Sequence, residues 1–339
     1  DEFRKNLIMP ALVTHHSTNV SGNWIEYSKN LRSAFGCAGV EDGSCLFSIF
    51  DGVKDVGDYT FWGRTAERIH EVVSGGIQIG NVQFGNECWN EVHDMQYVSN
   101  CHSSHDLFGC IGVKQGEYCI LNKRYDRESF EKLKARIIEQ MDAVPYADAR
   151  GRVYRYGEFF PPEFSPFAYN ETIAQEFFPI DKQIAEERGY RWRNPDTKNY
   201  KITLDSATVP DNVKDAVDSI TDEIIGCAHG GACKDQCTAA FRVTAEDLTM
   251  YRRANLPLPR LCPNCRHFER LKRRTPIKLW PRKCQCVGTA SANGHYQNTN
   301  SIHPTHTNGG ACPNEFETSY APDRPEIVYC LECYNAEVV

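Results

Sequence analysis

Ten of the sixteen cysteines lie in the last third of the chain, and they follow a repeated pattern. The string Gly-Gly-Ala-Cys at 230–233 is followed within thirty residues by Cys262-Pro-Asn-Cys265, and the same string at 309–312 is followed by Cys330-Leu-Glu-Cys333. A Cys-x-x-Cys turn supplies two of the four ligands of a tetrahedral zinc ion. Because 339 residues can build a large core without metal, the pattern predicts duplicated zinc modules with a local role.

The remaining ligands must come from upstream of each Cys-x-x-Cys pair. In the second module the partner of Cys312 stays open among two cysteines and two histidines, of which we choose Cys286. Two closed four-ligand sites predict structural zinc, about two ions per chain, because catalytic zinc keeps one position for water. Unmetallated thiols are the alternative. The predicted ligands are Cys233, Cys237, Cys262, Cys265, Cys286, Cys312, Cys330 and Cys333, with Cys227, His229, Cys284, His303 and His306 as substitutes.

Residues 1–125 are repetitive and rich in turn residues. Short apolar triplets alternate with Gly, Asn, Asp and Ser, and Phe-Gly-Cys-Ala-Gly-Val at 35–40 recurs as Phe-Gly-Cys-Ile-Gly-Val at 108–113. This favours a parallel β-solenoid whose coils each contain three short strands, with a β-sandwich as the rival. The six cysteines here lack metal-ligand spacing, so we interpret them as small inward-facing apolar residues. They are Cys37, Cys45, Cys88, Cys101, Cys110 and Cys119.

Residues 126–226 are predicted to form a helical cap and connector. Asp126 is a suitable N-cap for a helix that ends near Val144-Pro145, and its apolar face would cover the open end of the solenoid. The whole chain is therefore expected to be a mixed α+β protein with the solenoid at 1–125 and this connector at 126–226. The first zinc module with a basic segment follows at 227–283, and the second module at 284–339, in treble-clef or zinc-ribbon folds.

Charge is distributed unevenly along the chain. Between Arg252 and Lys283 there are eleven Lys and Arg residues against the single acid Glu269, which gives +10 in a chain of net charge −7. Such a segment favours a polyanionic partner, RNA or DNA, although the cations could instead offset thiolate charge or pair with acidic residues. The candidate contacts are Arg266, Arg270, Lys272, Arg273, Arg274, Lys278, Trp280 and Arg282.

Several strings resemble a family of cysteine-rich, zinc-binding bacterial proteins without an assigned activity. They include Leu-Pro-Leu-Pro-Arg-Leu-Cys-Pro-Asn-Cys-Arg at 256–266 and Phe-Glu-Thr-Ser-Tyr-Ala-Pro-Asp-Arg-Pro-Glu-Ile-Val-Tyr-Cys at 316–330, with further matches at 108–113, 118–125, 240–243 and 278–284. The resemblance implies zinc modules joined to a repetitive cysteine-rich domain. Members of the family carry a further zinc module before the solenoid and more solenoid cysteines, which suggests that Asp1 is not the natural start.

The sequence thus favours a zinc-stabilised binding protein that contacts nucleic acid through the basic segment. A protein assembly scaffold built on a stacking solenoid is the first alternative, and a solenoid enzyme of unknown substrate is the second. No catalytic residues are assigned. Without an apolar run of membrane length or a signal peptide, and with cysteines spaced for metal, a cytoplasmic setting and no membrane contact are expected.

Overall fold

The computed structural model describes residues 2–194, 200–300, 303–306 and 310–338. The chain forms two compact units, one made of Asp1–Ser165 with Thr275–Val339 and the other of Pro166–Arg274. The first unit joins the repetitive half to the second predicted zinc module, whereas the second unit contains the first module. The boundaries expected at 125 and 283 lie inside the first unit, and the one at 226 lies inside the second.

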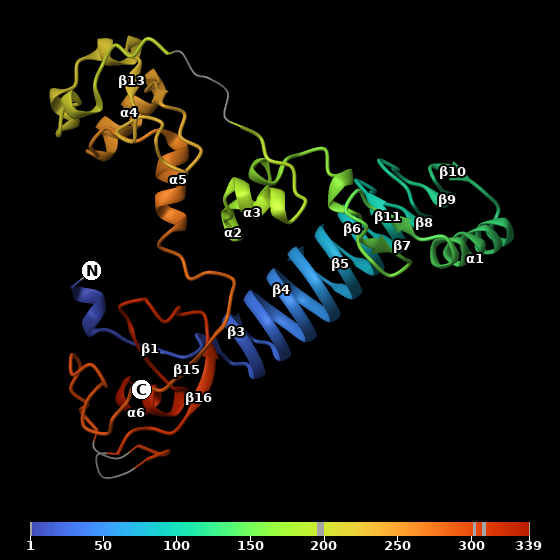
Figure 1. Cartoon of the computed structure of the whole chain (residues 1–339), viewed down its shortest axis with the longest axis horizontal. Helices are drawn as coiled ribbons and strands as arrows, with labels where there is room; N and C mark the ends of the chain where they lie inside the picture. Colours follow the sequence, from blue (N-terminus) through green and yellow to red (C-terminus); the bar gives the residue numbers. More distant parts are fainter. Residues whose placement is uncertain (1, 195–199, 301–302, 307–309, 339) are drawn as a thin grey trace. The chain divides into compact units, whose positions relative to one another are not determined.

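The repetitive half is a parallel β-solenoid, as predicted, and not a β-sandwich. Its nine-stranded sheet follows chain order from β2 to β10, and β9–β10 is an antiparallel pair. Stacked residues lie 13 positions apart in the middle coils, as in Val53, Ala66 and Ile79, so each coil rests on the one before it (Figure 1). The strands are β2 (Thr14–His15), β3 (Thr18–Glu26), β4 (Lys29–Gly63), β5 (Ala66–Gly76), β6 (Ile79–Trp89), β7 (Val92–Ser99), β8 (His105–Phe108), β9 (Glu117–Ile120) and β10 (Lys123–Arg124).

Each middle coil has four short sides, so the expectation of three strands per coil is wrong. In the coil that starts at Ala66, φ is positive at Arg68, Glu71, Ser74 and the pair 77–78, and the chain bends at each of them. Asparagine and aspartate tolerate this left-handed conformation better than most residues. Some of them form ladders between coils, in which an asparagine amide nitrogen donates to the Asn or Asp at the same corner of the next coil.

One such ladder runs through three successive coils. Asn19 Nδ2 donates to Asn30 Oδ1 at 2.9 Å, and Asn30 Nδ2 donates to Asp42 Oδ1 at 2.8 Å. The bonds fix the register of neighbouring coils at their exposed corners. Between corners, every third residue points inward, and apolar columns such as Ile69, Val82, Met95 and Leu107 fill the interior.

Five of the six solenoid cysteines are part of this interior. Cys37, Cys88, Cys101, Cys110 and Cys119 are buried and belong to one apolar cluster. Burial raises the pKa of Cys37 to about 11 and that of Cys88 to about 12, which keeps these thiols neutral. For Cys45 the prediction is wrong, because this residue occupies a left-handed corner and is exposed.

Alkylation of the folded protein is expected to single out Cys45 among the solenoid thiols. Burial and the neighbouring Asp58 carboxylate raise its pKa above the ordinary value, so labelling should be faster in mild alkali than at neutral pH. Peptide mass spectrometry after brief treatment with iodoacetamide measures the site, and Cys45→Ser should remove this label. Comparably fast labelling of Cys88 or Cys101 would contradict the inward placement of the cysteine column.

Helix α1 (Arg127–Ala143) covers the last coil, as the sequence predicted. The Ser129 amide donates to the Asp126 carboxylate at 2.9 Å, which caps the helix, and the helix ends at Val144. Phe130 is fully buried and packs in a cluster with Phe108 and Ile120 of the final coils. The hairpin of β11 (Tyr146–Ala147) and β12 (Val153–Tyr154) follows the helix (Figure 1).

The other end of the solenoid is covered by the C-terminal part of the same unit. Strand β1 (Ile8–Pro10) pairs in parallel with β17 (Ile327–Tyr329), and β15 (Trp280–Lys283) pairs with β16 (Glu315–Thr318), which contacts β3. A buried hydrogen bond of 2.6 Å from Asn23 Nδ2 to Ser319 Oγ joins this part to the first coils. Helix α6 (Leu331–Val338) ends the described chain.

The second unit has short elements around a small apolar core. Strands β13 (Ile225–Gly226) and β14 (Ala240–Phe241) form a hairpin. Thr244 caps helix α4 (Ala245–Ala254), which packs through Leu248 against Val213 and Ile220. The remaining helices of this unit are α2 (Ala174–Phe177), α3 (Lys182–Glu187) and α5 (Pro263–Leu271), and its short 3-10 turns lie at Tyr169–Glu171, Ser206–Thr208, Val213–Asp215 and Asp218–Asp222. Two further 3-10 turns, Phe3–Asn6 and Pro162–Phe164, belong to the first unit.

Candidate metal centres

The first group of four thiols lies in the second unit. Cys227 follows β13, Cys237 precedes β14, and Cys262 and Cys265 form the first turn of α5. The four sulfur atoms lie within 4.8 Å of one another, and the Cys227–Cys265 and Cys237–Cys262 pairs are both 3.9 Å apart. Sulfur ligands about 2.3 Å from a tetrahedral ion are about 3.8 Å apart. This tetrad therefore has the dimensions of a metal site.

The second tetrad lies in the first unit and repeats the arrangement. Cys284 follows β15, Cys312 precedes β16, and Cys330 and Cys333 lie at the start of α6. All four residues are buried, and Cys312 Sγ is 3.8 Å from Cys330 Sγ. Four convergent buried thiols could hold a metal ion here as well.

Backbone hydrogen bonds identify corresponding residues in the two modules. The amide of Cys262 donates to Cys227 Sγ at 3.3 Å, and that of Cys330 donates to Cys284 Sγ at 3.2 Å. Within each Cys-x-x-Cys pair, the amide of the last cysteine donates to the first sulfur, at 3.5 and 3.4 Å. Cys227 thus corresponds to Cys284, which supports the duplication inferred from the sequence.

Six of the eight predicted ligands belong to these tetrads, and two do not. The first tetrad takes Cys227, a substitute, where the sequence analysis placed Cys233. The second takes Cys284 where it placed Cys286. Cys233 and Cys286 lie instead in two adjoining groups, which also contain the substitutes His229, His303 and His306. In the first tetrad, the pairing of β13 with β14 explains why Cys227 is a member. It brings Cys227 beside Ala239, two residues after the ligand Cys237.

Hydrogen bonds favour the thiolate form at the first cysteine of each pair. A hydrogen bond from the Cys284 thiol lowers the pKa of Cys330 to about 4, although burial acts in the opposite direction. Burial also opposes ionisation of Cys262, but hydrogen bonds from Thr238 and from the Cys265 amide lower its pKa to about 6. The thiolate is the metal-binding form, so each centre offers one ready thiolate. Burial raises the pKa of Cys265, and the hydrogen bond with Cys330 raises that of Cys284, so a cation must displace the protons of these partner thiols.

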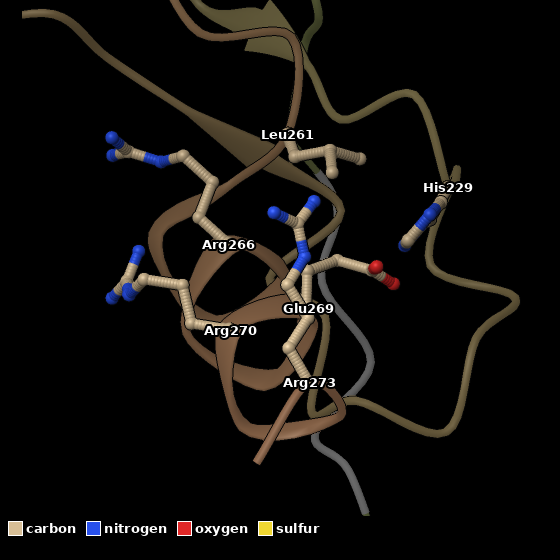
Figure 2. Close-up of a pocket in the computed structure, with 6 residues that line it drawn as sticks. All are labelled: His229, Leu261, Arg266, Glu269, Arg270 and Arg273. Carbon is tan, nitrogen blue, oxygen red and sulfur yellow. The ribbon is translucent and has the colours of Figure 1, made fainter. Parts of the chain in front are cut away.

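The basic residues are divided between the two units. Arg266, Arg270 and Arg273 lie on α5 or directly after it, spaced so that they share one helix face, and with His229, Leu261 and Glu269 they line a cavity of about 540 Å³. Arg266 also donates to the Tyr251 hydroxyl at 3.0 Å. Figure 2 shows that the Glu269 carboxylate points toward His229, whereas the guanidinium groups of Arg266 and Arg270 point away from it.

The other five candidate contacts have partners within the protein. Lys272 forms ion pairs with Asp235 and Glu269 at 2.7 and 2.9 Å, and Arg274 lies over the Phe177 ring. In the first unit, Lys278 lies over Trp280, and Arg282 donates to backbone carbonyl groups of Tyr320 and Ala321. These contacts match the alternative that the cations serve structural pairing.

Comparisons with known proteins give no identification. No family model, no curated protein and no solved structure matches the chain, so no family is established for it. Among the described residues, no helix has both the length and the apolar character needed to cross a membrane. The functional assignment therefore depends on the tetrads and on the cationic face of α5.

Proposed function

We propose that the chain is a zinc-stabilised binding protein that contacts the phosphate backbone of nucleic acid through Arg266, Arg270 and Arg273. Zinc is the proposed metal because four convergent cysteine thiolates suit it, and a closed site of this kind stabilises structure; all four cysteines are buried in the second tetrad and three of four in the first. In both modules the last two ligands occupy the first turn of a helix, which is the ligand arrangement of a treble clef. We therefore extend the proposal to that fold.

The observation that carries the nucleic-acid proposal is that the metal-site cysteines and the arginines belong to the same helix, α5. Cys262 caps α5, and Cys265 lies in its first turn, so a bound ion fixes the start of this helix. From Arg266 to Arg273 the helix rises about 10 Å, at about 1.5 Å per residue. A row of three cations of this length matches several consecutive phosphates better than a single small anion.

Ion pairing accounts for several other cations of the basic segment; the exposed Arg253 also lacks an ion pair among the described residues, but it lies on α4, outside the α5 face. Lys272 and Arg274 have the partners described above, while Arg252 pairs with Asp218 and Arg260 with Asp211, both at 2.6 Å. Among the described residues, Arg270 and Arg273 have no ion-pair partner. A cavity of about 540 Å³ beside them is also within the roughly 300–1,000 Å³ typical of ligand sites.

Replacing Arg270 and Arg273 by glutamate is expected to abolish most of the binding. With about three phosphates contacted, the affinity of the native protein should fall roughly 20- to 40-fold between about 50 and 200 mM salt. The double variant should lose more than about tenfold in affinity at low salt, and its salt slope should fall by about two. Fluorescence anisotropy with a short labelled RNA strand and a DNA duplex of matched length measures both quantities.

The control reverses the same charge elsewhere in the second unit. Lys214→Glu with Arg253→Glu changes two exposed cations that lie outside the α5 face, and this variant should bind as the native protein does. Equal loss in both variants would mean that net charge, and not this face, determines affinity. Salt-insensitive binding, or none, would refute the proposal while leaving the metal sites untouched.

The covered ends of the solenoid argue against a scaffold formed by end-to-end stacking. The last coil packs against α1, and the first coils contact β16 and Ser319. Both ends of the solenoid are thus covered within the described part of the chain, and stacking would require one cover to move.

A further inference from the structure

Each module contains a second group of metal-ligating side chains beside its tetrad. In the first module the group consists of His229, Cys233 and Cys265. In the second it consists of Cys286, His303, His306 and Cys333. Each group shares the last cysteine of the Cys-x-x-Cys pair with the adjoining tetrad, and this cysteine is Cys265 in one module and Cys333 in the other.

Distances in the second module match a coordination sphere with mixed ligands. Cys286 Sγ lies 3.4 Å from His303 Nδ1, and Cys333 Sγ lies 3.4 Å from His306 Nε2. A sulfur at about 2.3 Å and a nitrogen at about 2.0 Å from one tetrahedral zinc are about 3.5 Å apart. Cys286, His303 and Cys333 are also buried, so the group is not a chance cluster on the surface.

The environment of His303 supplies an independent sign of metal binding. Its Nε2 lies 3.0 Å from Glu337 Oε1, and both side chains are almost completely buried, with 1 % and 0 % exposed. The Glu337 carboxylate also accepts the backbone amides of Thr299 and Asn300. Histidines that bind metal commonly use the second ring nitrogen for such a carboxylate, which fixes the tautomer and the ring orientation. Nδ1 of His303 is then free to bind a cation beside Cys286.

Three histidines have a buried ring nitrogen that lacks a hydrogen-bond partner in the described structure: His102 of the solenoid, and His229 and His306 of the two second groups. In each of them the atom is Nδ1. Buried polar atoms are rarely left unsatisfied in proteins, so Nδ1 of His229 is a candidate ligand atom, whereas His306 would bind through the Nε2 that faces Cys333. In the first module, Cys233 Sγ also lies 3.5 Å from Cys265 Sγ, close to the spacing of two sulfur ligands.

A second ligand group thus adjoins the tetrad in both modules, with three members in the first and four in the second. His229 is two residues after Cys227, and Cys286 is two residues after Cys284, so each second group begins at the same offset from its tetrad. The two modules belong to different compact units, which means that one local distortion cannot explain both groups. The occurrence of such a group in two separate environments supports a metal-binding role for the second groups.

We propose that each module binds two zinc ions, which are bridged by the thiolate of Cys265 in the first module and of Cys333 in the second. Each module contributes five cysteines, whose thiolates offset the four positive charges of two ions and leave one negative charge. A single zinc ion bound by four thiolates leaves two negative charges. In the first module the second ion has three protein ligands and one position for water or an added ligand.

The inference rests on the zinc binding proposed above, and native mass spectrometry of the full chain with elemental analysis tests it. Four zinc ions per chain are expected. His303→Ala combined with His306→Ala should lower the number to three and leave the protein folded, because the tetrad of the second module is intact. His295→Ala changes an exposed histidine of the same segment and should retain all four. Two zinc ions per chain would overturn the bridged centres but remain consistent with one ion in each tetrad. A chain without zinc would refute both the bridged centres and the zinc binding of the tetrads.

Cadmium-113 provides a direct test of the shared thiolate. Two ¹¹³Cd nuclei bound to one sulfur show scalar coupling through it, so the cadmium-loaded chain should give two coupled pairs of resonances. The histidine double variant should lose one resonance and the coupling of its former partner. Glu337→Gln, which retains the shape of the side chain, should weaken the second ion about 10- to 100-fold without removing the tetrad ion. Four uncoupled resonances would show separate ions and overturn the bridge.

Discussion

Replacement of Cys262 by serine is expected to unfold the second unit around its hairpin and α5 while the solenoid stays folded. Cys262 is fully buried, belongs to the first tetrad and caps α5. Structural zinc contributes on the order of 10 kcal/mol to folding of small domains, comparable with the entire stability of about 5–15 kcal/mol. Limited proteolysis followed by mass spectrometry should show rapid cleavage within 200–274 and protection of the solenoid.

Cys45→Ser is the matched control, because it makes the same chemical change at an exposed solenoid corner. This variant should resist proteolysis as the native chain does. Strong chelation of the native protein should reproduce the Cys262→Ser pattern and, because the second tetrad is in the other unit, should also open 275–338. A chelated, metal-free chain that keeps native protection would show that the thiols pack without metal.

Local sequence signals predicted α1 and the class of the repetitive half, but not α5 or α6. The Asp126 cap and the apolar face after it identified α1. The coil geometry was missed because the strings compared were 73 residues apart and span several coils. A comparison at 13 residues would have aligned Val53, Ala66 and Ile79 and revealed one complete coil.

Ligand partition in the metal modules depends on tertiary pairing, and spacing alone does not decide it. Cys227 and Cys233 both lie upstream of Cys262, separated from it by a loop and a helix. Either of them could therefore join Cys237 as the upstream ligand pair that complements Cys262 and Cys265. The hairpin brings Cys227 into the tetrad and leaves Cys233 beside His229. The overlooked signal was the matching pair of strings Cys227-Ala-His229 and Cys284-Gln-Cys286, which places a second ligand two residues after the first in each module.

Charge counting likewise overestimated the basic surface. The +10 segment crosses the boundary between two units, and most of its cations contact acids, aromatic rings or carbonyl groups of their own unit. Ion pairs with distant residues such as Asp218 and Asp211 are invisible in a local count. The structure reduces the candidate face to three arginines, which makes the nucleic-acid proposal narrower and easier to test.

Phe130→Ala is expected to destabilise the solenoid by about 3–5 kcal/mol, the usual cost of deleting a buried aromatic side chain. Phe130 is fully buried in a cluster with Ile120 and Phe108, and Tyr118 lies 5.8 Å from its ring. Loss of this anchor should release α1 from the last coil. Denaturant unfolding followed by circular dichroism measures the loss of stability.

The release of α1 has a second consequence. It distinguishes a helix that protects the end of the solenoid from one that only contributes to core packing. An uncovered coil exposes unpaired strand edges, which promote association between chains. Light scattering of the Phe130→Ala variant should therefore increase with protein concentration before global unfolding begins. Phe3→Ala removes an equally large but exposed ring from the same unit and should change neither quantity. If Phe130→Ala lowers stability but the variant stays monomeric, α1 contributes core packing without protecting the end of the solenoid.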